Sequence, residues 1–198
     1  MILDCDLLRI DPAGALSIAL DAGVRFFQYR SKTGTRRQIY ETCNVLSPMA
    51  RQAGALFIVN DHADIAAVVE ADGVHLGQED LPIAEARRVV GTHAIIGIST
   101  HSREQAMAAE RAGADYIGLG PVFPTTTKDA GVIQGVEAVR AVRKAVSLPI
   151  VAIGGIGHGN CRDVLSAGAD AVAVISAILS ASDLAKAARD MMDLIHNR

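Results

Sequence analysis

A short phrase of small residues recurs along the chain and divides it into regular units. The phrase is a small residue and a glycine, usually with an aspartate beside them, followed by an apolar residue. Its five copies are Ala22-Gly23-Val24, Ala53-Gly54-Ala55, Ala71-Asp72-Gly73-Val74, Ala112-Gly113-Ala114-Asp115-Tyr116 and Ala167-Gly168-Ala169-Asp170-Ala171. A glycine in the left-handed conformation ends a helix and lets the chain turn directly into a strand. Each copy is therefore predicted to be a helix C-terminus followed by a strand.

Eight short apolar runs are predicted to be strands, and amphipathic helices fit between them. The predicted strands are Met1–Leu3, Phe26–Arg30, Leu56–Asn60, Gly73–Leu76, Ile95–Ser99, Tyr116–Leu119, Ile150–Ile153 and Ala171–Ile175. Asp11-Pro12 is a typical helix start, with Asp as the N-cap and Pro at the first position. Ser102 with Gln105 three residues later predicts a capping box.

Eight strand–helix units in 198 residues predict a single α/β domain over residues 1–198, folded as a (β/α)8 TIM barrel. Barrels of this kind typically have about 250 residues, and about 200 is the lower limit. An open doubly wound sheet is the alternative, but it would gather its polar residues at one switch point. Here, polar clusters follow nearly every predicted strand, and a closed barrel would bring all of them to one rim.

The composition is that of a soluble protein: half of the residues are hydrophobic, 21% are charged, and the formal net charge is −3. A nucleic-acid-binding surface would normally show a basic excess. The apolar runs are too short to span a bilayer, and no signal peptide is recognisable. The three cysteines form no metal-binding or disulfide pattern, so reduced thiols in the cytoplasm are the expectation. The oligomeric state stays open, and a homo-oligomer is one of the possibilities.

The loop Gly120-Pro121-Val122-Phe123-Pro124-Thr125-Thr126-Thr127-Lys128 follows the sixth predicted strand. Its glycine and prolines exclude a helix, and it carries three consecutive hydroxyls and one ammonium group. Several donors, a positive charge and an accessible backbone are what a phosphate group needs. We expect the segment from Thr125 to Gly135 to act as a lid that orders when anions bind.

A cationic cluster follows the second strand, and carboxylates follow the third and fourth. Gln28 and Arg30 share one face of their strand because residues two apart point the same way. Lys32 lies just beyond them. Asn60-Asp61 could simply form a turn, and Asp80 could simply cap the helix that follows it. Carboxylates beside an Arg/Lys cluster could equally hold Mg²⁺ over a phosphate-rich substrate.

The remaining strand ends predict a second anion site made of backbone groups and hydroxyls. Ser99 and Thr100 end the fifth strand and could simply be turn-forming residues. Gly154-Gly155 follows the seventh strand, and Ser176 follows the eighth. A glycine turn after strand seven and a helix start after strand eight form the usual phosphate position of this fold. One predicted site is therefore Arg30, Lys32, Asp61, Asp80 and Lys128, and the other is Thr125, Thr127, Gly155 and Ser176. Two anionic ligands over one barrel suggest a condensation.

Taken together, these motifs resemble the thiamine phosphate synthase (thiamine-phosphate pyrophosphorylase) family. The resemblance runs in order from about Gly23 to Ala177. Its motifs are Gln28-x-Arg30-x-Lys32, Asn60-Asp61, Gly73-Val74-His75-Leu76-Gly77-Gln78-Glu79-Asp80, Ser99-Thr100-His101, the Gly120–Lys128 loop and Val151-Ala152-Ile153-Gly154-Gly155-Ile156. The resemblance implies that 4-amino-2-methyl-5-hydroxymethylpyrimidine diphosphate reacts with a thiazole phosphate, carboxylated or not, to give thiamine phosphate and pyrophosphate.

The resemblance also implies a role for each matching residue. The pyrimidine diphosphate would contact Gln28, Arg30, Lys32, Asn60, Ser99 and Lys128. Mg²⁺ would be held by Asp61 and Asp80. The thiazole phosphate would contact Thr125, Thr126, Thr127, Gly155, Ile175 and Ser176. Arg30, Lys128 and Ser99 are the candidate catalytic residues, in a dissociative reaction in which pyrophosphate leaves before the thiazole nitrogen attacks.

Two other functions are compatible with the residues alone: a thiazole tautomerase-like paralogue, and a barrel that binds a phosphorylated ligand without catalysis. The first would lack parts of the diphosphate and Mg²⁺ set, which this chain keeps. Two structural expectations complete the analysis. The first strand, followed by Asp4, Cys5 and Asp6, is expected to be short or frayed, so that closure of the barrel there is in question. His75 is expected to be a core histidine with its hydrogen bonds satisfied.

Overall fold

Eight parallel strands form the centre of the computed structural model, which describes residues 1–125 and 132–196. The strands are β1 Ile2–Asp4, β2 Phe26–Arg30, β3 Leu56–Asn60, β4 Gly73–Leu76, β5 Ile95–Thr100, β6 Tyr116–Leu119, β7 Ile150–Ile153 and β8 Ala171–Ala173. They pair in chain order from β1 to β8. The predicted strands are confirmed, with small differences at the ends of β1, β5 and β8.

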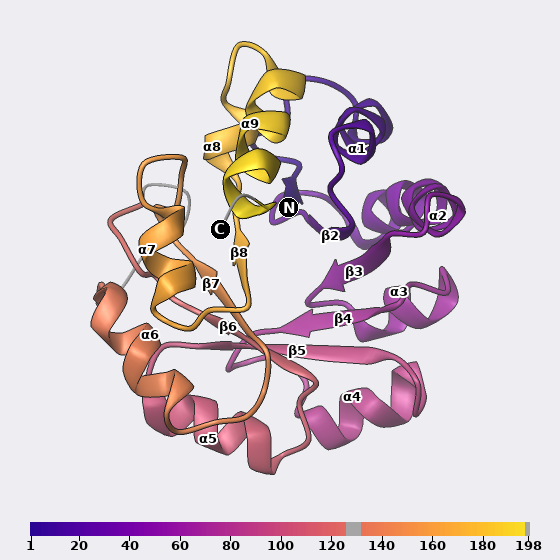
Figure 1. Cartoon of the computed structure of the whole chain (residues 1–198). Helices are drawn as coiled ribbons and strands as arrows, with labels where there is room; N and C mark the ends of the chain where they lie inside the picture. Colours follow the sequence, from indigo (N-terminus) through magenta and orange to yellow (C-terminus); the bar gives the residue numbers. More distant parts are fainter. Residues whose placement is uncertain (126–131, 197–198) are drawn as a thin grey trace.

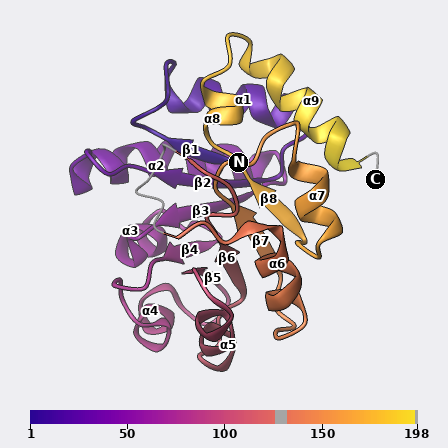
Figure 2. The ribbon, with the colours of Figure 1, turned by 90° about the vertical axis from the view of Figure 1, so that its left-hand side faces the viewer.

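Helices surround the strands in chain order, as Figure 1 and the turned view in Figure 2 show. They are α1 Pro12–Asp21, α2 Arg36–Gln52, α3 Ala63–Val68, α4 Ile83–Val90, α5 Arg103–Arg111, α6 Gly135–Arg143, α7 Cys161–Ser166, α8 Ser176–Leu179 and α9 Leu184–His196. Apolar side chains between the strands and this outer layer form the main core, with Phe57, Leu16 and Ile117 fully buried. The architecture is the predicted (β/α)8 barrel.

The barrel closes between β8 and β1. A backbone hydrogen bond runs from Ile2 N to Val174 O (3.1 Å), whereas β1 forms a continuous parallel ladder with β2. Asp4, the last residue of β1, is 1% exposed. Both ribbon views place the start of the chain beside β8 (Figures 1 and 2). The first strand is short, as expected, but it is buried and completes the ring.

Local signals account for the junctions between elements. Asp11 caps α1 by accepting a hydrogen bond from Gly14 N (2.9 Å), as predicted. Ser102 caps α5, but the side chain of Gln105 accepts from His101 N (2.7 Å), one residue before the expected partner.

The repeated glycine phrase behaves as predicted in four of its five copies, where Gly23, Gly54, Gly113 and Gly168 all have positive φ. The copy at Gly73 is an exception, and the prediction for it was wrong. Gly73 is the first residue of β4, and the left-handed residue is Glu70 (φ 49°). A Cβ at Gly73 would lie 1.9 Å from Ile95 O, so this glycine is required by the close approach of β5.

The aspartates of the phrase fasten the amino ends of the strands. The carboxylates of Asp72, Asp115 and Asp170 accept hydrogen bonds from the backbone N–H of Phe57, Ile96 and Ile150, at 2.7 to 2.8 Å. Each bond ties the start of one strand to the loop that precedes another. The amino end of the barrel is thereby dedicated to structure, which leaves the carboxyl end for chemistry.

Candidate functional site

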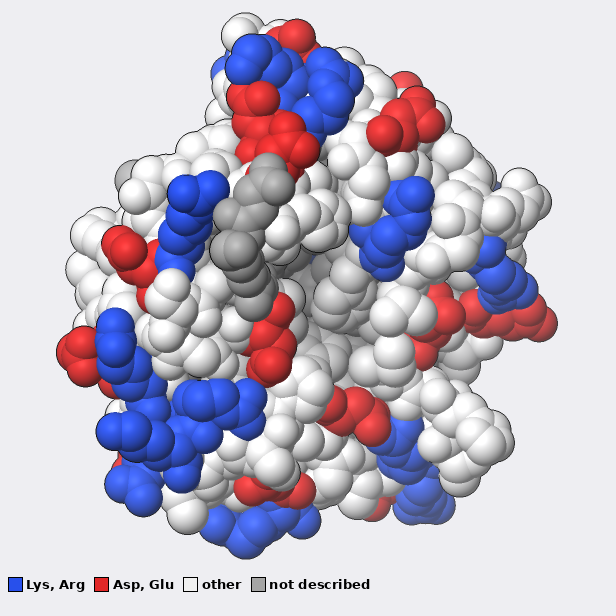
Figure 3. All heavy atoms as spheres, in the orientation of Figure 1, with Lys and Arg blue, Asp and Glu red and all other residues white. Residues whose placement is uncertain are grey.

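A pocket of about 820 Å³ opens at the carboxyl ends of the strands and continues into the barrel. The space-filling view shows a hollow in the middle of one face, with acidic and basic side chains around it (Figure 3). Eight of the predicted site residues line this pocket: Gln28, Arg30, Asn60, Ser99, Thr125, Gly155, Ile175 and Ser176. Thr126, Thr127 and Lys128, with much of the expected lid, lie outside the described residues.

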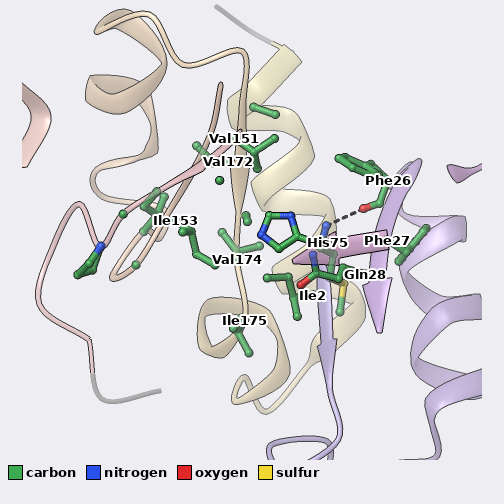
Figure 4. Close-up of a pocket in the computed structure, with 18 of the residues that line it drawn as sticks. Ile2, Phe26, Phe27, Gln28, His75, Val151, Ile153, Val172, Val174 and Ile175 are labelled. Carbon is green, nitrogen blue, oxygen red and sulfur yellow. Dashed lines mark hydrogen bonds between the residues drawn. The ribbon is translucent and has the colours of Figure 1, made fainter. Parts of the chain in front are cut away.

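The pocket exists because small residues face the barrel axis on one side. Gly118 and Gly120 on and after β6, with Ala171 and Ala173 on β8, line it and project little or no side chain into it. Figure 4 shows His75 in the middle, with Phe26 and Gln28 of β2 on one side and Ile153 and Val174 on the other. The walls are mostly apolar, and polar groups are concentrated at the strand ends, as in typical ligand pockets.

Arg30 reaches the pocket from the end of β2 and is held by Asp4. The two residues are paired in register between β1 and β2, and Arg30 Nη1 donates to Asp4 Oδ2. The Asp4 side chain is 1% exposed and that of Arg30 is 14% exposed. Because a buried carboxylate anchors one side of the guanidinium, its position beside the pocket is fixed.

Asp4 is a site residue that the sequence analysis missed. It appeared to belong to an irregular loop because Cys5 and Asp6 follow it. A signal for it was present, since an inward-facing arginine needs an anionic partner. Asp4 lies two residues after Ile2, so its side chain shares the inward face of that strand.

The two predicted metal carboxylates come together beside Lys32. Lys32 Nζ lies 2.6 Å from Asp61 Oδ2. Asp61 adopts φ 63°, an uncommon conformation for a residue with a side chain, and its N–H donates to His75 O (2.8 Å). Partial burial and the neighbouring negative charge of Asp61 raise the pKa of the Asp80 carboxyl, against a hydrogen bond from Gly77 N–H that lowers it.

Asp80 does not cap the following helix, which was the simpler interpretation. Its Oδ2 accepts from Gly77 N (2.6 Å), and α4 begins without a side-chain cap. Two adjacent carboxylates repel each other, which contributes to the raised pKa of Asp80, and a bound cation would offset this repulsion. In the described part of the chain, no three His, Cys, Asp or Glu side chains form a metal cluster.

The opposite rim consists of backbone and small residues. Gly155 has φ +62°, and a Cβ there would lie 2.4 Å from Pro124 O and 2.8 Å from Phe123 Cβ. Only glycine fits without displacing the loop after β6. Ser176 begins α8 directly after Ile175, and both line the pocket with Thr125. The two predicted anion sites therefore lie on different arcs of the rim, insofar as their residues are described.

His75 is the core histidine that was predicted, and both of its ring nitrogens are hydrogen-bonded. Nδ1 lies 2.8 Å from Tyr116 Oη, and Nε2 lies 2.9 Å from Ser99 Oγ. These partners are 41 and 24 residues away in the sequence. Tyr116 was taken only as the first residue of a strand, so its part in the site was missed.

The fold and the site together define a class of protein. A (β/α)8 barrel with an arginine and a glycine turn around one pocket, and paired carboxylates at the neighbouring strand ends, has the form of an enzyme that handles phosphorylated small molecules. No helix in the described residues is long and apolar enough to cross a membrane.

Comparison with known proteins identifies the family. The family model described as "Thiamine monophosphate synthase" matches residues 2–178, and the chain belongs to this family. It is accordingly a transferase of thiamine biosynthesis. The chain is 47% identical over 181 residues to a thiamine-phosphate synthase from Chloroflexus aurantiacus, covering 91% of this chain and 83% of the relative. A thiamine-phosphate synthase from Pelotomaculum thermopropionicum is 48% identical over 180 residues, covering 90% and 83%.

Solved structures agree. A thiamine phosphate pyrophosphorylase from Pyrococcus furiosus superposes with a TM-score of 0.91 at 40% identity, covering 99% of this chain and 94% of that one. An orotidine 5'-phosphate decarboxylase from Pyrococcus horikoshii has a TM-score of 0.69 at 18% identity, covering 99% of each chain. The second likeness concerns the barrel fold alone.

Proposed function

We propose that this chain condenses 4-amino-2-methyl-5-hydroxymethylpyrimidine diphosphate with a thiazole phosphate, in its carboxylated or uncarboxylated form, to give thiamine phosphate and pyrophosphate, with loss of carbon dioxide from the carboxylated form. The observation that carries the proposal is one pocket with two different arcs of candidate anion-binding residues at its rim. On the arc from β2 to β4, Arg30 lines the pocket, and Lys32, Asp61 and Asp80 lie at the neighbouring strand ends without lining it. On the other arc, Gly155 and Ser176 line the pocket after β7 and β8. Family membership supplies the chemistry of the two ligands.

The diphosphate would occupy the cationic arc. Arg30, fixed by Asp4, would donate to its oxygens. Asp61 and Asp80 would hold Mg²⁺, which when bound supplies the positive charge that a diphosphate leaving group requires. Lys32 neutralises Asp61 in the absence of a ligand and would be free to turn to the diphosphate when the metal takes its place.

The thiazole phosphate would occupy the other arc. Gly155 allows a phosphate to approach the backbone without a side chain between them, and Ser176 presents a helix start. The two ligands would then meet over the apolar floor of the pocket. A floor that excludes water protects a reactive cation from hydrolysis.

The reaction would proceed by dissociation. The bond between the pyrimidine methylene carbon and the diphosphate oxygen breaks, and the oxygen keeps the electron pair. The thiazole nitrogen lone pair then forms the new C–N bond. This scheme needs no nucleophilic side chain, and it gains most from groups that stabilise the departing oxygen, for which Arg30, Ser99 and Lys128 are the candidates.

The test is to incubate the purified chain with both phosphorylated substrates and Mg²⁺ and to assay for thiamine phosphate and pyrophosphate. We expect Arg30→Gln to lower kcat/KM by about 100-fold or more, equivalent to about 2.7 kcal/mol. Arg51→Gln, which removes an exposed partner of Glu70 away from the site, is the matched control and should keep normal activity.

Failure of the wild-type chain to form thiamine phosphate would overturn the proposal. Isomerisation of a thiazole phosphate without any condensation would favour the tautomerase-like alternative. Tight binding of both phosphorylated ligands without turnover would favour a non-catalytic binding protein.

A further inference from the structure

Three polar side chains form a continuous line of hydrogen bonds across the inside of the barrel. The line runs from Tyr116 on β6 through His75 to Ser99. Tyr116 Oη lies 2.8 Å from His75 Nδ1 on β4, and His75 Nε2 lies 2.9 Å from Ser99 Oγ on β5. Tyr116 and His75 are 6% and 9% exposed. All three residues line the pocket, so the line runs along its wall.

The barrel makes room for the two rings with glycines. A Cβ at Gly97 would lie 2.1 to 2.5 Å from atoms of the Tyr116 ring, and a Cβ at Gly118 would lie 3.0 Å from His75 Cε1. Phe26 packs edge-on against Tyr116, with ring centroids 5.6 Å apart and planes at 76°. Because their neighbours are fitted to them, the rings have little freedom to turn away from each other.

The chemistry of Tyr116 and His75 determines which group donates in each hydrogen bond of the line. Burial raises the pKa of Tyr116, so the phenol stays protonated. A phenol is a stronger acid than a neutral imidazole, and an imidazole nitrogen is a better acceptor than a phenol oxygen, so the phenolic proton is donated to His75 Nδ1. A ring that accepts at Nδ1 carries its proton on Nε2 and donates it to Ser99 Oγ.

We infer that Tyr116 and His75 are positioning residues that direct the hydroxyl proton of Ser99 into the pocket. With its oxygen already accepting from His75, Ser99 Oγ keeps its own proton available for an acceptor in the pocket. The backbone of Ser99 is fixed as well, because Gln78 Nε2 donates to Ser99 O (2.6 Å). This role rests on the proposed function, in which the hydroxyl donates to the departing diphosphate.

The direction of the line can be measured in the free protein, without substrates. In ¹⁵N-histidine-labelled protein, we expect the His75 ring to be neutral with its proton on Nε2. The spectrum of His75→Gln identifies the signals of this histidine among the six in the chain. A proton on Nδ1 alone, or on both nitrogens, would reverse or break the line and overturn the inference.

Tyr116→Phe removes the donor to Nδ1 while keeping the ring. We expect the proton of His75 to redistribute between its nitrogens in this variant. In the condensation assay, kcat should fall about 5- to 10-fold, which corresponds to the loss of about one hydrogen bond. The KM for the pyrimidine diphosphate should stay within about twofold, because the charge on the leaving oxygen develops only in the transition state.

Thr100→Val is the matched control. Thr100 follows Ser99 in β5 and is fully buried, and its hydroxyl donates to Gly118 O (3.1 Å) rather than into the pocket. It should leave both the His75 spectrum and kcat unchanged after correction for stability. Equal losses of kcat in Tyr116→Phe and Thr100→Val would show a structural effect only and overturn the inference. If the wild-type chain forms no product, the proposed function fails, but the spectrum still decides the direction of the line.

Discussion

The ion pair between Asp4 and Arg30 gives the sharpest test of how the first strand serves the site. Asp4→Asn keeps the shape of the side chain but cannot satisfy both of its neighbours. Asp4 Oδ1 accepts from Asp6 N (3.1 Å), and Oδ2 accepts from Arg30. An amide has one oxygen, so its NH₂ group must face either the guanidinium or the Asp6 N–H, and in both cases a donor meets a donor.

The expected cost follows from burial. Removing one partner of a fully buried ion pair costs about 3–5 kcal/mol. The Arg30 side chain is 14% exposed on its pocket side, where water can reach it, so we expect a smaller loss of about 2–3 kcal/mol. For a chain of 198 residues, this lowers Tm by about 5–10 °C. Saturating pyrophosphate should recover part of the loss, since it would give Arg30 an anionic partner.

Thermal unfolding by circular dichroism, with and without pyrophosphate, measures these changes. Asp6→Asn is the control, because Asp6 is exposed and its hydrogen bond from Thr33 Oγ1 can be kept by an amide oxygen. It should change the free energy of unfolding by less than about 0.5 kcal/mol. Equal Tm values for the two variants would refute the reasoning that Asp4 holds Arg30.

Three further predictions concern the rim and the interior. The raised pKa of Asp80 means that the folded state prefers the protonated carboxyl, so stability is lost as pH rises through that pKa. In EDTA, Asp80→Asn should therefore raise Tm at pH 7 but not at about pH 3, while kcat/KM in Mg²⁺ falls about 100-fold; an equal gain in Tm at both pH values would contradict this. Gly155→Val should raise the KM for the thiazole phosphate far more than that for the pyrimidine diphosphate in steady-state kinetics, and equal effects would refute the division of the rim. Gly97→Ala should displace Tyr116, lowering Tm by several degrees and shifting the His75 ring signals, and unchanged signals would show that the glycine is not needed for the ring.

Much of the fold could be predicted because the strands are short apolar runs, and β2, β3, β6 and β8 are each entered from a glycine turn. The prediction went wrong at Gly73 because the phrase looks the same whether its glycine ends a helix or allows a neighbouring strand to approach. Only the position of Ile95, 22 residues later, separates the two cases.

The site was predictable wherever its residues follow strands, because parallel strands bring their carboxyl ends to one rim. Arg30 and Gly155 are examples. Partners that lie within strands were harder to find. Asp4 and Tyr116 are buried residues whose neighbours are set by barrel register, and register is not visible in a single strand.

Because the barrel closes between β1 and β8, ligands bound at the rim would help to hold this join together. In the described part of the chain, a backbone hydrogen bond from Ile2 to Val174 joins β1 to β8, in place of a continuous ladder. Asp4 and Arg30 stand on one side of this seam, and Gly155 and Ser176 stand on the other. Bound substrates would therefore contact residues on both sides of the seam and link them. Product release would remove that link, so the join between β1 and β8 would be held more tightly with substrates bound than after the products leave.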